Sequence, residues 1–226
     1  MRILVIGHGR MGRLVEALAP EHGCEVAGIA EIDAPVARVL ETAGPVDVAI
    51  DFSQADAVIA NLTALAARGV NAVVGTTGWQ AHEGSLRGLV DRTGLGVLAS
   101  ANFSLGVHIF RHLVEEAART FGGIDAGAWI HEAHHAAKKD APSGTALLLL
   151  DAMRQAGYPR TIDVSSTRAG SIPGTHVVGF DGPADTVTLT HTVRDRAVFA
   201  HGALDAAKWL RGRHGWFSMR DMIDAL

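Results

Sequence analysis

The stretch from residue 132 to residue 146 carries the highest density of side chains that could do chemistry. Two imidazoles and two ammonium groups stand close together, followed by Pro-Ser-Gly-Thr: His134, His135, Lys138, Lys139 and residues 142–145. An imidazole titrates near neutral pH and can donate a proton. Ammonium groups and helix N-terminal amides bind carboxylates. With Ser143 as the N-cap of a helix over 143–155, the amides of Gly144 and Thr145 would point outward. The stretch therefore predicts a site that binds a small acidic molecule and protonates it.

A second interpretation applies to the same residues. His131-Glu132-Ala133-His134-His135 matches H-E-x-x-H, in which two histidines one helical turn apart bind zinc and the glutamate acts as a base. That geometry requires a helix, whereas Trp129-Ile130 and the glycines before them favour an extended chain. A zinc hydrolase remains an alternative, and the favoured interpretation predicts no metal.

A glycine pattern follows the first apolar run of the chain. Residues 7–12, Gly7-His8-Gly9-Arg10-Met11-Gly12, match G-x-G-x-x-G between a strand and a helix. Glycines there let the backbone approach a pyrophosphate, and the helix N-terminus supplies amide donors. Glu31, 19 residues after Gly12, stands where a carboxylate can accept hydrogen bonds from ribose hydroxyls. Together they predict a dinucleotide site that includes Gly7, Gly9, Arg10, Met11, Gly12 and Glu31.

Two further loops follow later strands of the same half. Gly75-Thr76-Thr77 comes after the fourth apolar run, and Ser100-Ala101-Asn102-Phe103 after the fifth. Both loops would lie at the carboxyl edge of a parallel sheet, where such folds bind ligands. We therefore expect all seven residues to line the cofactor site.

The elements that must position these groups form two regions. In residues 1–104, strand patterns at 3–6, 25–30, 46–52, 71–75 and 97–100 alternate with helical patterns at 10–19, 55–68 and 83–92. Strands without period-two alternation, each followed by a helix, predict an α/β fold with a Rossmann-type, doubly wound parallel sheet.

The pattern changes after residue 104. A long helix at 105–121 leads to a strand ending near Glu132 and to the helix at 143–155. Strand patterns follow at 161–167, 176–180, 186–192 and 197–200, before a final helix at 203–211. Residues 105–200 are expected to form a smaller α+β domain with an open mixed or antiparallel sheet. Residues 201–226 would return to the dinucleotide-binding domain of residues 1–104.

Composition excludes several classes of function. The formal net charge is −4 and no basic stripe is interleaved with aromatic residues, so nucleic-acid binding is not expected. No apolar run is long enough to cross a membrane, and residues 1–6 enter a strand pattern directly, unlike a signal peptide. Cys24 is the only cysteine, as is typical of a reducing compartment. We expect a cytoplasmic protein.

With these motifs assembled, the chain resembles the 4-hydroxy-tetrahydrodipicolinate reductase (dihydrodipicolinate reductase) family over nearly its whole length. The motifs that carry the resemblance are 9–12, 75–78, 101–107, 132–146, 168–170, Gly174 with His176, and 199–203. The resemblance implies a Rossmann-type cofactor domain. It also implies that residues 105–200 are a substrate-binding and oligomerisation domain, whose open mixed sheet builds a homotetramer. It implies His134 as the catalytic proton donor, Lys138 as a second donor, and His135, Gly144 and Thr145 as substrate-binding residues.

The chain departs from the family pattern in three places. One residue fewer separates the first two fingerprint glycines, His131 stands where the family usually has an aliphatic residue, and the regions after Ile32 and before Arg168 are short. These departures affect contacts near Gly7 and His8 and the loops around the cofactor.

The favoured function is NAD(P)H-dependent reduction of 4-hydroxy-tetrahydrodipicolinate to tetrahydrodipicolinate in diaminopimelate and lysine biosynthesis. A hydride would reach the ring of this small heterocyclic dicarboxylate, and His134 would protonate the neighbouring atom. Glu31 and Asp33 near the ribose, against Arg10 as the nearby cation, favour NADH over NADPH, which remains usable. A non-catalytic dinucleotide sensor is the other alternative.

Overall fold

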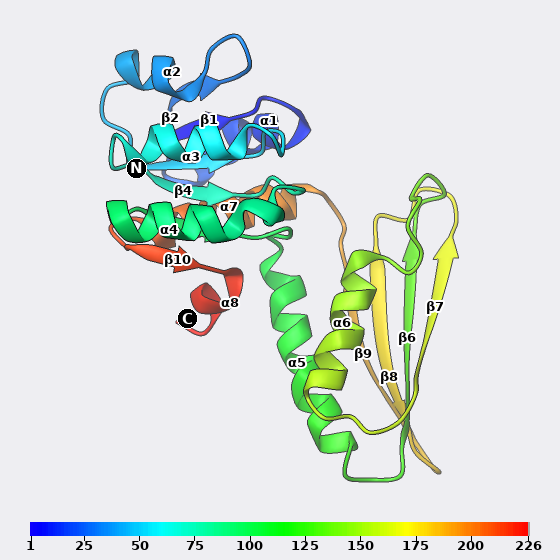
Figure 1. Cartoon of the computed structure of the whole chain (residues 1–226). Helices are drawn as coiled ribbons and strands as arrows, with labels where there is room; N and C mark the ends of the chain where they lie inside the picture. The colour runs from blue at the N-terminus through cyan, green and yellow to red at the C-terminus, as the bar shows by residue number, and fades with distance from the viewer. Residues whose placement is uncertain (226) are drawn as a thin grey trace. The chain divides into compact units, whose positions relative to one another are not determined.

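The computed structural model describes residues 1–225 of the chain, which divide into two compact units. Unit 1 comprises Met1–Leu105 with Ala197–Leu226, and unit 2 comprises Gly106–Arg196 (Figure 1). Within the described residues, no helix combines the length and apolar character needed to cross a membrane.

Unit 1 is built on a six-stranded sheet in which every pair of neighbouring strands is parallel. The strand order is β10-β5-β4-β3-β1-β2. The strands are β1 (Arg2–Ile6), β2 (Glu25–Ala30), β3 (Val48–Asp51), β4 (Asn71–Val74), β5 (Gly96–Ala99) and β10 (Gly215–Phe217). The order reverses between β1 and β3, so the carboxyl ends of these strands form the switch point where such sheets bind ligands.

Helices cover both faces of this sheet, because its strands are apolar on both sides. Along β1, Ile3 and Val5 enter one core with α1 (Arg10–Leu18) and α7 (Ala197–Leu210), whereas Leu4 and Ile6 enter the other. The second core is covered by α2 (Val36–Thr42), α3 (Val58–Ala66) and α4 (Glu83–Thr93). Short 3-10 turns (Ala19–His22 and Gln80–His82) and α8 (Met219–Ile223) complete unit 1. The expected Rossmann-type doubly wound fold is confirmed.

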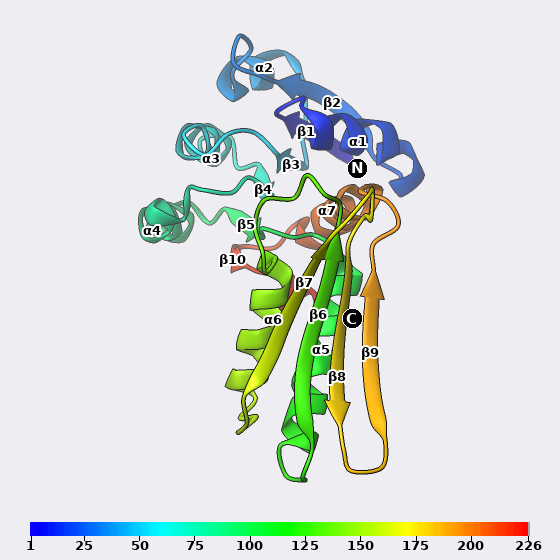
Figure 2. The same cartoon turned by 90° about the vertical axis from the view of Figure 1, so that its right-hand side faces the viewer.

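Unit 2 is an open mixed sheet with two helices on one face. The strand order is β7-β6-β8-β9, with β6 parallel to β7 and antiparallel to β8, and β8 antiparallel to β9. The elements are α5 (Leu105–Phe121), β6 (Gly127–His134), α6 (Gly144–Gln155), β7 (Ile162–Arg168), β8 (Thr175–Asp181) and β9 (Thr186–Thr192). Figure 2 shows the strands side by side with α5 and α6 behind them. The helices pack on Ile130, Val178 and Phe180, which confirms the expected open mixed sheet.

The sequence prediction was wrong at the start of α7. Residues 197–200, expected as a strand, form the first turn of this helix, which therefore begins before residue 203. Ala200, Ala203 and Ala207 are fully buried at helical spacing, so a small-residue face packs the helix onto the sheet. The prediction also missed the short elements α2, β10 and α8, and α8 rather than α7 is the final helix.

Candidate active site

The glycine fingerprint lies between β1 and α1, as expected, and the structural requirement for glycine differs from one position to the next. A Cβ on Gly12 would stand 1.9 Å from the carbonyl oxygen of Gly7, and Gly7 has a φ of +82°. Gly9 is the N-cap of α1, where no side chain caps the helix and no atom lies within 4 Å of a Cβ position. The first turn, with Arg10 and Met11, thus presents backbone amides to open space, which fits a pyrophosphate.

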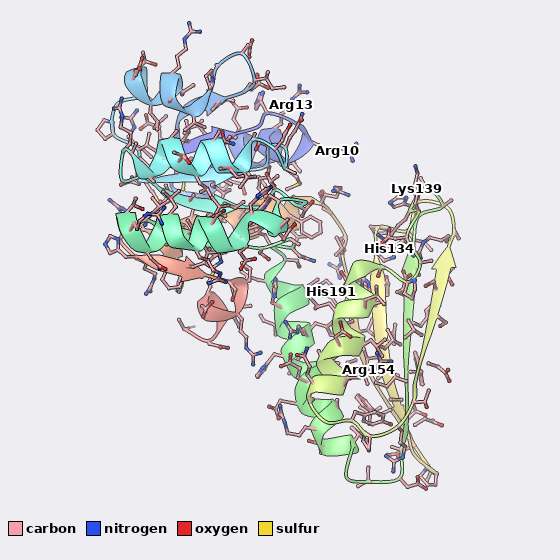
Figure 3. The ribbon with its side chains drawn as sticks, viewed as in Figure 1. Arg10, Arg13, His134, Lys139, Arg154 and His191 are labelled. Atoms are coloured by element: carbon pink, nitrogen blue, oxygen red, sulfur yellow. The ribbon has the colours of Figure 1, made fainter. Side chains whose placement is uncertain are left out.

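The predicted ribose carboxylate stands at the end of the neighbouring strand. Glu31 follows β2 directly, is exposed, and begins a tight turn in which its N–H and carbonyl both bond to Ala34. Ile32 beside it is 91% exposed. Arg10 and Arg13 both project from α1 (Figure 3). Sequence reasoning considered Arg10 alone and missed Arg13, which lies one turn further along the helix.

The loop after β4 is held by a buried carboxylate that sequence reasoning missed. Asp51, at the end of β3, accepts hydrogen bonds from Thr76 Oγ1 at 3.0 Å, from Asn61 Nδ2 at 3.0 Å and from the Ser53 amide at 2.8 Å. Gly75 donates its N–H to the Asp51 carbonyl, and Thr77 is exposed. The signal was an acidic residue closing an apolar strand. Asp51 therefore positions the Gly75-Thr76-Thr77 loop.

The loop after β5 contains both surface and core residues. Ser100 Oγ donates to the Asn102 carbonyl at 2.6 Å, and the Asn102 carboxamide accepts from the Ser104 amide at 2.8 Å. Ala101 is exposed, whereas the Phe103 side chain is 2% exposed and packs edge-on against Phe52. A contact of Phe103 with a cofactor would therefore have to come from its backbone.

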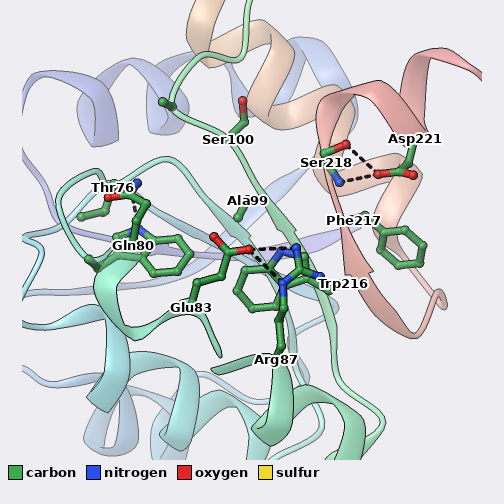
Figure 4. Close-up of a pocket in the computed structure, with 12 residues that line it drawn as sticks. Thr76, Gln80, Glu83, Arg87, Ala99, Ser100, Trp216, Phe217, Ser218 and Asp221 are labelled. Carbon is green, nitrogen blue, oxygen red and sulfur yellow. Dashed lines mark hydrogen bonds and ion pairs between the residues drawn. The ribbon is translucent and has the colours of Figure 1, made fainter. Parts of the chain in front are cut away.

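A cavity of about 490 Å³ adjoins these two loops within unit 1 (Figure 4). Thr76, Ser100 and Ala101 line one part of it, and the rest is formed by the turn before α4, the end of β5, and residues of α4 and β10 and at the start of α8. Its charged walls are already paired: Arg87 bonds to Glu83 at 2.8 Å and lies over the Trp216 ring, and Asp221 accepts from Ser218. The cavity therefore offers polar surface next to the predicted cofactor loops.

In unit 2, the candidate catalytic groups gather around a buried carboxylate on β6. Ala128 and Ile130 face the core, and strand alternation puts Glu132 on the same side, where it is fully buried. Arg168, at the end of β7, makes a bidentate ion pair with Glu132 at 2.6 and 2.9 Å. The sequence analysis listed Glu132 and Arg168 within motifs but gave neither a role. The acidic residue at a core-facing position of a strand was the signal that could have identified Glu132.

His134 and Lys138 each have an acidic partner. The Nδ1 of His134 makes a short hydrogen bond with Glu132 Oε2. Lys138 Nζ donates to both oxygens of Asp140, at 2.7 and 2.9 Å, and this hydrogen bond lowers the pKa of the Asp140 carboxyl. The imidazole is thus anchored at one nitrogen, and the ammonium group is held in the loop between β6 and α6.

The N-terminus of α6 is formed as expected. Ser143 is its N-cap and accepts a hydrogen bond from the Ala146 amide at 3.2 Å. Gly144 is exposed and has no atom within 4 Å of a Cβ position, while Thr145 and His135 are half-buried. The exposed start of this 12-residue helix suits a carboxylate.

The helical zinc motif is not formed. His131, Glu132 and His134 lie on strand β6, and His135 follows its end, so His131 and His135 do not share a helix face. A different set, Glu132, His134 and His176, has ligand atoms within 4.8 Å of one another. Both oxygens of Glu132, however, already accept from Arg168, whose positive charge opposes a cation there.

His176 is a buried imidazole that sequence reasoning noted only as part of a motif. It lies on β8 opposite Glu132, is 4% exposed, and shares a hydrogen bond of 2.9 Å with Ser143 Oγ. Its ring centroid lies 5.1 Å from that of His134. Burial, reinforced by the neighbouring His134, lowers the pKa of His176 to about 4, which keeps it neutral at pH 7.

Comparison with known proteins supports what the two units separately indicate. The family model described as "Dihydrodipicolinate reductase, N-terminus" matches residues 1–103, and the model described as "Dihydrodipicolinate reductase, C-terminus" matches residues 106–223. The 4-hydroxy-tetrahydrodipicolinate reductase of Caldanaerobacter subterraneus is 36% identical over 99% of this chain and 98% of its own length. The enzyme of that name from Methanoculleus marisnigri is 39% identical over 88% of this chain and 82% of its own.

A solved structure agrees in fold. The dipicolinate-bound dihydrodipicolinate reductase from Paenisporosarcina sp. TG-14 superposes with a TM-score of 0.82 over 96% of this chain and 97% of its own, at 20% sequence identity. The matched regions include the fingerprint of unit 1 and the Glu132–Thr145 region of unit 2. The chain therefore belongs to the dihydrodipicolinate reductase family of NAD(P)H-dependent oxidoreductases.

Proposed function

We propose that the chain reduces 4-hydroxy-tetrahydrodipicolinate, the compound in its relatives' names, to tetrahydrodipicolinate in diaminopimelate and lysine biosynthesis, with His134 as the proton donor. The observation that carries the assignment of His134 is its hydrogen bond to buried, arginine-paired Glu132. An imidazole anchored at Nδ1 has its other nitrogen available for proton transfer.

The chemistry divides between the two units. Replacement of a ring hydroxyl by hydrogen consumes one hydride and one proton and releases one water. Reduced nicotinamide, when bound, supplies the hydride. In unit 1 the amides of Gly9–Gly12, Glu31 and the loops after β4 and β5 bind and orient the dinucleotide. In unit 2 His134 holds the proton, Lys138 is a second donor, and His135, Gly144 and Thr145 bind the carboxylates.

We propose NADH as the preferred cofactor, with NADPH also accepted. Glu31 is exposed at the end of β2, with Asp33 two residues further, so the ribose region carries two carboxylates. A carboxylate accepts from a free 2′-hydroxyl and repels a 2′-phosphate. Arg10 and Arg13 on α1 are the nearby cations that allow NADPH to bind.

We propose a homotetramer formed through the open face of the unit 2 sheet. On that face Trp129 packs over Gly179, and threonines of β9 continue it outward: Thr186, Thr188, Thr190 and Thr192. The described part of unit 2 places both of its helices on the opposite face. An open, half-polar sheet face is suited to packing against a copy of itself. Light scattering tests this, and a monomer-sized species would contradict it. A cytoplasmic location is proposed from the single cysteine and the biosynthetic substrate.

The test of function is oxidation of NADH that depends on freshly made 4-hydroxy-tetrahydrodipicolinate. We expect His134→Gln to lower kcat by about 10²–10⁴-fold while the Kd for NADH stays within about twofold, because only a proton donor is removed. His112→Gln, at an exposed position of α5 in the same unit, is the matched control and should keep wild-type turnover. Unchanged turnover in His134→Gln would overturn its role. NADH binding without substrate-dependent oxidation in the wild type would instead favour a dinucleotide sensor.

A further inference from the structure

Glu132 is an ionisable group whose side chain is fully buried. Its two oxygens accept at least four hydrogen bonds. Arg168 donates to both oxygens, the Ser143 amide donates to Oε1 at 3.1 Å, and His134 bonds to Oε2. A charge is retained in such a place only if its partners compensate for lost hydration.

We propose that Glu132 is a positioning residue that fixes the tautomer and charge of His134, and that Arg168 holds Glu132 in place for this purpose. The proposal rests on the proposed role of His134 as proton donor. An ionised carboxylate has no proton to give, so Nδ1–H of His134 must donate to Oε2. The transferable proton is then confined to Nε2.

The carboxylate keeps its charge throughout the working pH range. Burial by itself would raise the pKa of Glu132, but the hydrogen bonds from Arg168, Ser166, His134 and Ser143 outweigh it and lower the pKa to about 2. The direction of the hydrogen bond between Glu132 and His134 therefore does not reverse near neutral pH.

The other groups around His134 do not take over this role. His176 on β8 is neutral because burial lowers its pKa, and burial also lowers the pKa of His191 on β9. In the loop after β6, Lys138 and Asp140 neutralise each other. Among the described residues, Glu132 is thus the carboxylate bonded to the His134 ring, and Arg168 is the cation that balances it.

Opposite effects on His134 are expected when each partner is altered. Glu132→Gln removes a negative charge beside the imidazole, so the alkaline limb of the activity profile should move to a lower pH. Arg168→Gln leaves that negative charge unbalanced, so the alkaline limb should move to a higher pH. Arg168→Lys keeps the positive charge and is the matched control. A merely structural role for the network would reduce activity in both glutamine variants without moving the pH limits in opposite directions.

The first measurement is the pH dependence of kcat and KM for these three variants and the wild type. We expect Glu132→Gln to lower kcat more than it raises KM, and to move the alkaline limb of kcat/KM down by about one pH unit. Arg168→Gln should move the limb up by a similar amount, and Arg168→Lys should move it little. Limbs that coincide in all four proteins, or that shift in one direction in both glutamine variants, would overturn the proposal.

The second measurement does not depend on activity. Nitrogen-15 spectra of the histidine side chains, with the His134 signal identified by its absence in His134→Gln, report which ring nitrogen carries the proton. The wild type should show the Nδ1–H tautomer. In Glu132→Gln the amide NH₂ is best placed facing Nδ1, because Oε1 accepts from both the Ser143 amide and Arg168 at 2.6 Å, whereas Oε2 accepts from Arg168 only at 2.9 Å, so the ring should change to the Nε2–H tautomer.

The two readouts separate failure of the proposal from failure of the proposed function. Full turnover in His134→Gln together with an Nδ1–H tautomer in the wild type would refute the catalytic role of His134 but leave the positioning by Glu132 intact. Loss of turnover in His134→Gln with the same tautomer in the wild type and in Glu132→Gln would refute the positioning alone. If Glu132→Gln fails to fold, two measurements still test the positioning role. They are the pH profile of kcat/KM for Arg168→Gln and the nitrogen-15 spectrum of the wild type.

Discussion

Gly174 lies directly against the His134 ring. A Cβ added to Gly174 would stand 3.1 Å from Nε2 and 3.2 Å from Cδ2 of the imidazole, and Gly174 has a φ of +142°. Glu132 therefore holds one edge of the ring while the bare backbone of Gly174 borders the other. The nitrogen left for proton transfer is the one that faces the glycine.

We expect Gly174→Ala to lower kcat by about 10–100-fold, because the methyl group displaces the working nitrogen of His134. NADH affinity should not change, since the cofactor motifs lie in unit 1. Gly157→Ala is the matched control: its φ of +86° also lies in the range that L side chains rarely adopt, but no atom lies within 4 Å of its Cβ position. Equal losses of kcat in both variants would show that strain, not contact with His134, is responsible.

The neutral, buried His176 predicts that the chain loses stability in mild acid. Burial lowers its folded-state pKa from 6.5 to about 4, so below pH 6.5 the unfolded chain binds a proton that the folded chain refuses. Stability is therefore full above pH 6.5 and falls as the pH drops toward 4. The expected loss between pH 7 and pH 5 is about 2 kcal/mol from this residue.

Urea unfolding at both pH values checks this expectation. His176→Gln should remove most of the loss attributed to His176, whereas His112→Gln, on the exposed side of α5, should retain the wild-type pH dependence. Parallel pH dependences in the wild type and His176→Gln would exclude His176 as the source. His191, whose pKa burial also lowers, adds to the remaining slope.

Two of the three fingerprint glycines, Gly9 and Gly12, predict that cofactor binding and folding can be separated. Gly9→Ala places a methyl group in open space over the start of α1, so the fold should keep its stability while NADH affinity falls at least about tenfold. Gly12→Ala would meet the Gly7 carbonyl at 1.9 Å and should destabilise the fold by about 1–3 kcal/mol. Thermal melts and NADH titrations distinguish the two effects. Tight NADH binding by Gly9→Ala would argue against a pyrophosphate at this turn.

Local sequence signals were sufficient for much of the fold. The fingerprint turn, α5 at 105–121 and the Ser143 cap could be predicted because each depends on periodicity or on residues within one turn. Residues 197–200 were misassigned because Val198 and Phe199 suit a strand, whereas Ala200 belongs to the small-residue face by which α7 packs in the core of unit 1. The three-residue strand β10 carries too short a pattern to detect.

The candidate site was predictable as a set of residues but not as a network. The motif at 132–146 marks His134 and Lys138 in the sequence. The residues that complete the surroundings of His134 come from other strands, however. Arg168 on β7 pairs with the Glu132 carboxylate, and His176 on β8 lies against the His134 ring. Such contacts depend on strand order and register, which a single sequence does not specify. The H-E-x-x-H match similarly has meaning only on a helix, and residues 131–134 form a strand.

The final prediction concerns the choice between NADH and NADPH. Glu31 stands exposed at the end of β2, where its carboxylate can accept from the two ribose hydroxyls, and Asp33 adds a second negative charge. Arg10 and Arg13 offset this only in part, because Arg13 Nε already donates to the His8 carbonyl at 3.2 Å. We therefore expect kcat/KM to favour NADH about tenfold, equivalent to about 1.4 kcal/mol.

Two variants and one control test the cause of this preference. Glu31→Ser should lower the efficiency with NADH and raise that with NADPH, because it removes both the hydrogen-bond acceptor and the repulsion of a phosphate. Arg10→Ala should weaken NADPH more than NADH. Glu25→Gln, at the opposite end of β2 and ion-paired with Arg2, should change neither. Steady-state kinetics with both cofactors at one pH and ionic strength give the answer. Equal or better wild-type efficiency with NADPH would mean that the arginines of α1, rather than Glu31, govern the ribose pocket.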